Sequence, residues 1–272
     1  MPLVIAGHQR SGTTMLMELC NAHPEIALGS ELGCFLNMGE SRASYALRML
    51  RRWLVVAAFK RDPVVRTGEE MPPEQGFPRW ELGIALRNFA SGIRFTASAV
   101  RNSRERVNAG SIEAALRSIL PDRRIVGDKY PDYTYELDRL TVSGGPTVVA
   151  IYRDCRDVAV STLHLARGRW RHRRFSQLMD TPEKVACRWV RSIEAMEEHA
   201  ESVHAIRYED FVRNPEEGLA VLAAWLDVDP GGFETSSIAT DRVGRHKAGL
   251  SAEETAVLLE IAGPHMQRLG YL

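Results

Sequence analysis

The sequence predicts an α/β fold in which a central parallel sheet lies between two layers of helices. Short apolar segments suited to buried parallel strands alternate with longer segments of helical character. A glycine-containing loop directly follows the first strand, and a long stretch without any strand signal separates the second strand from the third. Strands that alternate with helices in this way form a parallel sheet with helices on both faces.

Five segments are expected to form the strands. They are Leu3 to Ala6, Ile26 to Leu28, Arg124 to Val126, Thr147 to Tyr152 and Val203 to Arg207. Helix starts are marked by a capping residue before proline or three residues before glutamate. These starts are Thr181-Pro182, Asn214-Pro215 with Glu217, and Ser251 with Glu254, and Gly270 is expected to end the last helix.

The long interval between the second and third strands is expected to be a helical insertion, residues 41–120. It contains the apolar run from Trp53 to Phe59 and the loop TGEEMPPEQGFP. An insertion of this length in an α/β domain usually builds a lid or one wall of a pocket. We expect one domain, residues 1–272, in which 41–120 forms a lid over the acceptor pocket.

Composition indicates an ordinary globular protein. The net charge is +0, 44% of residues are hydrophobic, and no apolar run is long enough to span a bilayer. We therefore expect no nucleic-acid or membrane partner. The first strand leaves no room for a signal peptide, so a cytoplasmic location is expected. Four cysteines without a C-x-x-C pair indicate neither a disulfide framework nor a zinc site.

The loop GHQRSGTT, Gly7 to Thr14, resembles the phosphate-binding sequence G-x-x-x-x-G-K-[ST]. Glycines stand at its first and sixth positions, but Thr13 occupies the lysine position and Arg10 lies early in the loop. Backbone N–H groups of such a loop and of the next helix bind anions. The fold is therefore expected to be of the P-loop type, although a plain turn with Thr13 as the helix N-cap remains an alternative.

A loop without the lysine does not suit a nucleoside triphosphate, whose γ-phosphate that lysine contacts. The stretch GHQRSGTTMLMELCNAHPEIALGSE is similar to the opening of sulfotransferases that use 3′-phosphoadenosine-5′-phosphosulfate (PAPS), above all the branch with tyrosylprotein sulfotransferases and many bacterial sulfotransferases. The resemblance implies sulfuryl transfer from PAPS, with adenosine 3′,5′-bisphosphate (PAP) as product. It also implies that Arg10 contacts the transferring sulfuryl group. The donor-binding residues implied by the resemblance are Arg10, Ser11, Gly12, Thr13 and Thr14.

A second match lies in IYRDCRDVAVS, residues 151–161. A strand followed by arginine, with serine eight residues later, resembles the family's 3′-phosphate signature, so the resemblance implies that Arg153 and Ser161 bind that phosphate. Arg153 lies at the end of a strand, and Ser161 lies about two turns into the following helix, so both side chains can reach the same phosphate. Arg156 is expected at the surface as a partner of Asp157.

The resemblance also implies the catalytic residues. Glu31 in GSELG matches the family's general base, and Lys129 in VGDKYPDY matches the lysine that stabilises the transition state. Both follow predicted strands, at the sheet edge where ligands bind. Lysine is scarce in this chain, and a retained lysine indicates a need for a compact ammonium. A solvated Glu31 and a surface Lys129 are the alternatives, and His8 is an alternative base.

The C-terminal loop RVGRHK resembles a segment common in bacterial sulfotransferases. It is expected to close over the nucleotide through Arg242, Gly244 and Lys247. Gly33 departs from the tyrosylprotein branch, which has an arginine there near its acceptor. Together with the missing secretory segment, this favours a small-molecule hydroxyl or phenol over a protein acceptor.

Two other functions remain open at this point. A P-loop kinase would use Asp128 as its magnesium ligand, and a nucleotide-binding protein could keep the fold without the reaction. The sulfotransferase chemistry requires no metal site, and none is expected.

Overall fold

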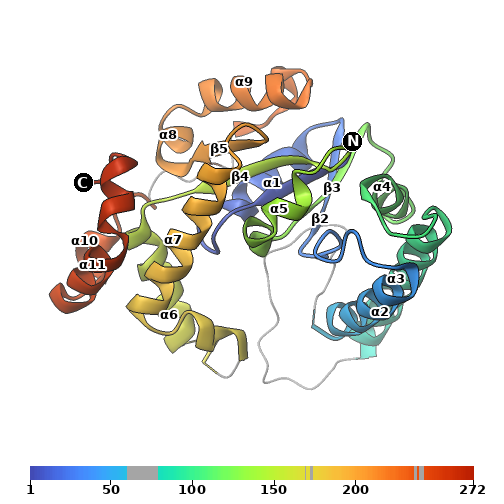
Figure 1. Cartoon of the computed structure of the whole chain (residues 1–272), viewed down its shortest axis with the longest axis horizontal. Helices are drawn as coiled ribbons and strands as arrows, with labels where there is room; N and C mark the ends of the chain where they lie inside the picture. Colours follow the sequence, from blue (N-terminus) through green and yellow to red (C-terminus); the bar gives the residue numbers. More distant parts are fainter. Residues whose placement is uncertain (60–78, 169, 172–173, 236–237, 239–241) are drawn as a thin grey trace.

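The computed structural model describes residues 1–59, 79–168, 170–171, 174–235, 238 and 242–272. Its centre is a five-stranded parallel sheet in the order β2-β3-β1-β4-β5 (Figure 1). The strands are β1 (Leu3–Ala6), β2 (Ile26–Ser30), β3 (Ile125–Lys129), β4 (Thr147–Tyr152) and β5 (Val203–Arg207). All five predicted strands and the α/β class are confirmed.

The third strand begins one residue later and ends three residues later than predicted. Its last residues, Gly127, Asp128 and Lys129, are not an apolar run, yet all are buried. A Cβ on Gly127 would lie 1.9 Å from the carbonyl oxygen of Leu3, so glycine lets β1 and β3 approach. Lys129 therefore belongs to the strand itself.

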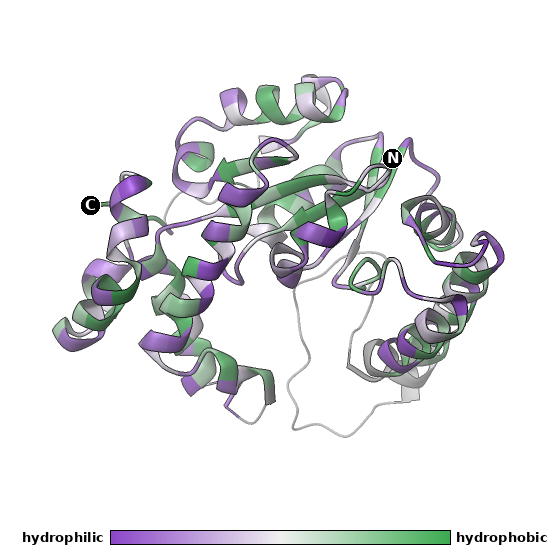
Figure 2. Cartoon of the chain, in the orientation of Figure 1, coloured by the Kyte–Doolittle hydropathy of each residue, from purple (hydrophilic) through white to green (hydrophobic). Residues whose placement is uncertain are grey.

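Helices cover both faces of the sheet, as predicted. Alternate strand residues point to opposite faces, so Leu3 and Ile5 pack in a different cluster from Val4 and Ala6. The first cluster includes α1 (Thr13–Ala22), α8 (Tyr208–Arg213) and α9 (Pro215–Leu226). The second includes α4 (Ala109–Arg117) and α5 (Leu137–Leu140). Hydrophobic residues accordingly concentrate on the central strands (Figure 2).

A third cluster joins the helices beyond β4. It contains residues of α6 (Cys155–Arg167), α7 (Pro182–Glu198) and α11 (Ala252–Arg268). Shorter elements are η1 (Pro131–Tyr135), η2 (Arg174–Leu178), η3 (Pro230–Gly232) and α10 (His246–Gly249). No helix within the described ranges is both long and apolar enough to cross a membrane.

The insertion between β2 and β3 is helical, as predicted. It contains α2 (Arg42–Phe59), α3 (Arg79–Arg101) and α4, and it lies to one side of the sheet (Figure 1). Trp53 of α2 packs against Phe95 of α3 with ring centroids 6.2 Å apart. A Cβ on Gly92 would lie 2.3 Å from Trp53, so glycine admits this indole. The loop TGEEMPPEQGFP lies outside the described residues.

Most of the predicted helix ends are confirmed. Thr181 caps α7, Ser251 and Glu254 form a capping box on α11, and Gly270 follows α11 at φ 71°. The helix start predicted at Asn214-Pro215 is confirmed, since Asn214 is the N-cap of α9, but the capping box suggested by its spacing to Glu217 is absent because the Asn214 side chain makes no capping hydrogen bond. Asn214 also ends α8, where its backbone N–H donates to the carbonyl of Asp210.

Candidate active site

The loop after β1 needs both of its glycines. Gly7 has φ 143°, and a Cβ there would lie 2.3 Å from the carbonyl oxygen of Ile151 in β4. Gly12 has φ 105°, and a Cβ there would lie 2.7 Å from the ring of Tyr208. Gly12, and not Thr13, is the N-cap of α1, so the alternative of a Thr13 cap is wrong. The turn is built for close backbone packing at the helix start.

The N-terminus of α1 therefore opens at the carboxyl edge of the sheet, where first-turn N–H groups have no partner inside the helix. Ser11 is completely buried beside them. Its hydroxyl oxygen has no hydrogen-bond partner among the described residues. A buried hydroxyl without a partner is uncommon in a native structure and is typical of a site that receives a ligand or water.

Arg10 and Ser161 are brought together, although the sequence places them in separate motifs. The Nε of Arg10 donates to the Ser161 hydroxyl at 2.8 Å. Arg10 has φ 72°, uncommon for a residue with a side chain, and its side chain is exposed. The contact holds the guanidinium at the mouth of the loop, against α6.

Lys129 and Glu31 form an ion pair next to the same loop. The ammonium Nζ lies 3.0 Å from Oε1 of Glu31 and 3.4 Å from the hydroxyl of Thr14. The Lys129 side chain is 2% exposed, whereas that of Glu31 is 36% exposed. The alternative of a surface Lys129 is therefore wrong. A buried cation thus joins the first turn of α1 to a carboxylate that reaches solvent.

Asp128, the magnesium ligand of the kinase alternative, has a different role. Its carboxylate is completely buried and accepts hydrogen bonds from the backbone N–H groups of Leu32 and Gly33 and from the hydroxyl of Tyr133. Burial raises the pKa of the Asp128 carboxyl, whereas these bonds and the charge of Arg52 oppose the rise. Asp128 is therefore a structural anchor of the turn that carries Glu31.

Arg52 is a residue of this region that the sequence analysis missed. It comes from α2, donates to the backbone carbonyls of Glu31 and Leu32, and lies 4.6 Å from the ring centroid of Tyr130. The only sequence signal was Gly33, which leaves space beside the turn. A Cβ at Gly33 would lie 2.4 Å from Cζ of Arg52, so the guanidinium fills that space.

Arg153 meets the C-terminal loop through Asp157. It donates to the Asp157 carboxylate at 3.1 Å and to the carbonyl of Arg242, and it lies over the ring of Tyr208. The Arg153 Nε is buried without a partner in the described part of the chain. Tyr208 thus contacts both Arg153 and the phosphate-type loop, a bridge that the sequence did not predict.

Asp157 ties the loop of residues 242–247 to the start of α6. It accepts backbone N–H bonds from Gly244 at 2.7 Å and His246 at 2.9 Å, and a side-chain contact from His246 at 2.7 Å. Burial pushes the pKa of Asp157 upward, but the bonds from His246 and Gly244 and the charge of Arg153 outweigh it and hold the pKa below its usual value. The Lys247 side chain is exposed.

Arg156 pairs with Asp154 and not, as predicted, with Asp157. Its guanidinium lies 2.7 Å from the Asp154 carboxylate and also donates to the carbonyl of Tyr271. Asp154 caps α6, which holds its carboxylate within reach, whereas Asp157 is already bonded to the C-terminal loop. Arg156 therefore joins the start of α6 to the C-terminal residues.

The carboxylate of Asp132 also contacts the loop. Oδ1 of Asp132 accepts from Gln9 at 2.8 Å and from Arg188 at 3.1 Å, which ties the loop to η1 and α7. Burial raises the pKa of Asp132, opposed by Arg188 and Gln9, while the negative charge of Glu31 adds to the rise. Asp132 and Glu31 are therefore near enough to influence each other.

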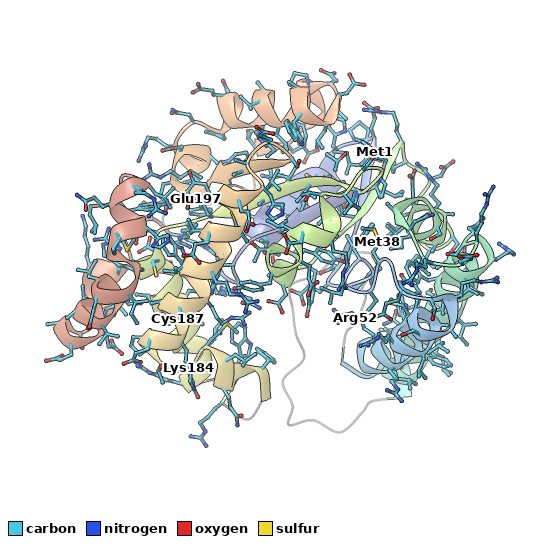
Figure 3. The ribbon with its side chains drawn as sticks, in the orientation of Figure 1. Met1, Met38, Arg52, Lys184, Cys187 and Glu197 are labelled. Atoms are coloured by element: carbon cyan, nitrogen blue, oxygen red, sulfur yellow. The ribbon has the colours of Figure 1, made fainter. Side chains whose placement is uncertain are left out.

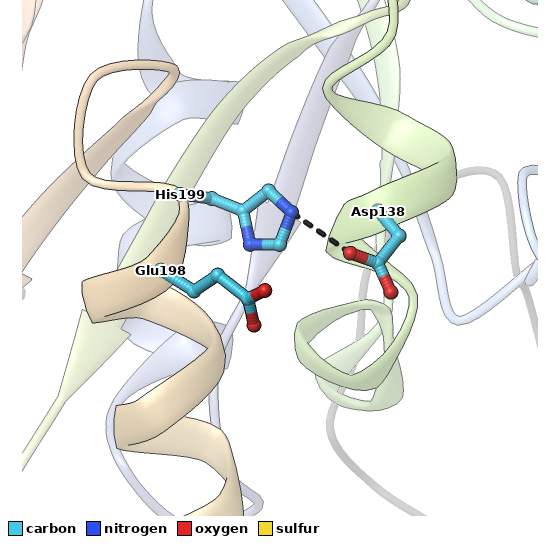
Figure 4. A group of neighbouring side chains, drawn as sticks. All are labelled: Asp138, Glu198 and His199. Atoms are coloured by element: carbon cyan, nitrogen blue, oxygen red, sulfur yellow. Dashed lines mark ion pairs between the residues drawn. The ribbon is translucent and has the colours of Figure 1, made fainter.

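One further group of ionisable side chains joins α7 to α5 rather than to the loop. Figure 4 shows His199 facing Asp138, with Glu198 beside them. His199 Nε2 lies 3.1 Å from Oδ1 of Asp138, and its Nδ1 lies 2.9 Å from the carbonyl of Ala195. These two contacts hold the His199 ring between the last turn of α7 and Asp138 of α5.

The fold and the loop define the class: a P-loop-type α/β protein with a glycine-containing turn before its first helix and an adjacent lysine–carboxylate pair. The chain belongs to the Sulfotransferase family, whose profile matches residues 2–230. It is accordingly a transferase of sulfuryl groups, and the resemblance noted from its motifs is confirmed. A search of curated protein sequences found no match.

Solved structures support the fold. The sulfotransferase domain of the Synechococcus PCC 7002 olefin synthase aligns at 16% identity and a TM-score of 0.54, over 97% of this chain and 94% of that one. A sulfotransferase from Alicyclobacillus acidocaldarius aligns at 17% identity and a TM-score of 0.52, over 99% and 94%. At such identities the likeness concerns the arrangement of strands and helices.

Proposed function

We propose that this sulfotransferase takes its sulfuryl group from PAPS and delivers it to the hydroxyl or phenol of a small molecule. The observation that carries the proposal is the buried Lys129 ammonium, in contact with both Thr14 of the loop and Glu31. A cation there lies between the donor loop and a candidate base, where charge develops during transfer.

The residues present fit a nucleotide with phosphates at both ends of its ribose. Loop residues 10–14 offer N–H groups at the start of α1 and the Ser11 hydroxyl, which has no hydrogen-bond partner among the described residues. The 3′-phosphate would be held by the 242–247 loop and by Arg153, whose Nε has no partner in the part of the chain that the structure describes. Ser161 would add its hydroxyl to the 3′-phosphate site, next to Arg10, from which that hydroxyl accepts a hydrogen bond. PAPS, when bound, supplies the sulfuryl group, whose bond to the 5′-phosphate oxygen breaks as the acceptor oxygen attacks sulfur.

Three side chains have separate roles in the transfer reaction: Glu31, Lys129 and Arg10. Glu31 accepts the proton of the acceptor hydroxyl, because its carboxylate is partly exposed while its backbone is fixed. Lys129 and Arg10 stabilise the negative charge that grows on the departing phosphate and on the sulfuryl oxygens. The proton moves to Glu31, and the electron pair of the broken bond stays with the nucleotide product.

His8 is the weaker candidate for the base. It is fully buried in the loop, and burial lowers its pKa to about 4, with only the bond to the Gln9 carbonyl opposing the shift. An imidazole that is so weakly basic and so enclosed is poorly suited to take a proton from an acceptor.

The rest of the proposal concerns partners and organisation. Residues 41–120 would act as a lid that shapes the acceptor pocket, within a single domain of residues 1–272. We propose a small-molecule acceptor, no nucleic-acid or membrane partner, and a cytoplasmic location, in keeping with the neutral net charge.

Two measurements test this function. Thermal unfolding with PAP and excess EDTA should show stabilisation of roughly 2.7 kcal/mol at a hundred times the dissociation constant, and adenosine 5′-phosphate should give much less. Incubation with PAPS and a panel of phenols and alcohols, followed by mass spectrometry, should show a sulfated product. A protein that PAP does not stabilise refutes the proposed donor.

The base is tested by Glu31→Gln, with the exposed Glu105→Gln as the matched control. Loss of a positioned base should lower kcat by about 10² to 10⁴-fold and leave PAP affinity nearly unchanged, whereas the control keeps both. Normal turnover by Glu31→Gln together with loss in His8→Ala would move the base to His8.

A further inference from the structure

The turn that carries Glu31 is held between two opposite charges. It follows β2 and contains two consecutive peptide groups, one joining Glu31 to Leu32 and one joining Leu32 to Gly33. The N–H of each group donates to the Asp128 carboxylate, at 3.0 Å from Leu32 and 2.7 Å from Gly33. The same two peptide groups direct their carbonyls at a different residue.

That residue is Arg52. Its Nη2 donates to the carbonyl of Glu31 at 3.0 Å, and its Nε donates to the carbonyl of Leu32. Each peptide dipole therefore has its positive end on a carboxylate and its negative end on a guanidinium. Hydrogen bonds to charged groups are stronger than those between neutral groups, so four such bonds fix both peptide planes.

The backbone at this turn needs such support. Glu31 has φ 59° and Gly33 has φ 64°, in the left-handed region that residues with a side chain rarely occupy. The N–H of Glu31 donates to the carbonyl of Lys129 at 2.7 Å, which ties the turn to β3. This conformation directs the Glu31 carboxylate at the Lys129 ammonium.

Three features place the Arg52 side chain at the turn. Gly33 has no Cβ where the guanidinium lies, the ring of Tyr130 packs 4.6 Å from Cζ, and α2 brings the side chain in from the insertion (Figure 3). Desolvation lowers the pKa of Arg52, but its surroundings, Tyr130 foremost, raise it overall, so the guanidinium stays charged.

We propose that Arg52 is a positioning residue for sulfuryl transfer: with Asp128 it clamps the Glu31 turn and couples the helical insertion to the base. The proposal rests on the proposed function in assigning the base to Glu31. Misplacing a catalytic group by about 1 Å costs on the order of 10²-fold in rate. Loosening the turn should therefore slow the chemical step without disturbing the nucleotide loop.

The test compares Arg52→Met with Arg51→Met, which removes the neighbouring exposed arginine of the same helix. With PAPS and a phenol as substrates, Arg52→Met should lower kcat by about 10 to 100-fold, while the Kd for PAP in calorimetry stays within about twofold. Guanidinium ion in the buffer should restore part of the Arg52→Met rate. The Arg51→Met protein should match wild type in all three measurements.

Hydrogen exchange of the peptide that spans residues 26–38 gives a readout independent of turnover. The N–H groups of Leu32 and Gly33 should exchange about tenfold faster or more in Arg52→Met, because two charged hydrogen bonds no longer restrain their peptide groups. Exchange in β1 and α1 should be unchanged. Arg52→Lys, which keeps the charge but not the fork, should fall between wild type and Arg52→Met.

Three outcomes would overturn the clamp: wild-type kcat in Arg52→Met, a loss of PAP affinity in parallel with kcat, or faster exchange spread evenly over the chain. Failure of the proposed function looks different. In that case the wild-type protein would form no product from PAPS, while the local change in hydrogen exchange would still be seen in Arg52→Met.

Discussion

Replacing Lys129 with methionine separates catalysis from stability most clearly. Methionine keeps the apolar stem of the side chain, which is 2% exposed, and removes only the ammonium 3.0 Å from Glu31. Removing one partner of a fully buried ion pair costs about 3 to 5 kcal/mol. Because the Glu31 side chain is 36% exposed, water can solvate the remaining carboxylate. The loss of stability should therefore be smaller than that range.

The expected effect on the rate is larger. Removing one group that stabilises developing charge costs about 10² to 10³-fold in kcat, or about 2.7 to 4 kcal/mol. We therefore expect Lys129→Met to lose that factor in kcat, to bind PAP as wild type does, and to unfold only a few degrees lower. Steady-state kinetics with PAPS, calorimetry with PAP and thermal unfolding measure the three quantities.

Lys184→Met is the matched control. Lys184 lies on α7, bonds Asp180 at 2.7 Å and is 48% exposed, so its loss should leave kcat within about twofold. The reasoning is refuted if Lys129→Met turns over at the wild-type rate. It is equally refuted if PAP affinity falls as far as kcat, because Lys129 would then act on donor binding and not on the transition state.

Three further predictions concern the donor site. Arg153→Ala should erase most of the preference for PAP over adenosine 5′-phosphate, about 10 to 150-fold, measured by calorimetry of both nucleotides. The pKa of Asp157 is lowered in the folded protein, so its contribution to stability is complete above the unfolded pKa of about 3.9 and is lost as pH falls through the folded value. The free energies of unfolding of wild type and Asp157→Asn should therefore converge at low pH, as measured by acid unfolding. Gly12→Ala places a Cβ 2.7 Å from Tyr208 at φ 105°, and loss of PAP binding in a folded protein is expected in thermal-shift titration.

The sequence was a good guide to the scaffold because strand burial and loop chemistry are local properties. Five apolar runs gave five parallel strands, and a glycine pattern marked the turn between β1 and α1. The error at the end of β3 has a cause that is not local in the sequence. The end of β3 was missed because Asp128 and Lys129 are polar residues buried by partners distant in the sequence.

The sequence by itself determined the class of fold, the position of the glycine-containing loop between β1 and α1, and the residue types available to the candidate site. Only the tertiary structure decided which of them meet: Arg10 with Ser161, Lys129 with Glu31, and Arg153 with the C-terminal loop. Periodicity and glycine spacing are set by neighbours along the chain, whereas these contacts join residues that are 89 to 151 positions apart. The Arg52 clamp is the extreme case, because a side chain of α2 and a carboxylate of β3 act on peptide groups that belong to neither.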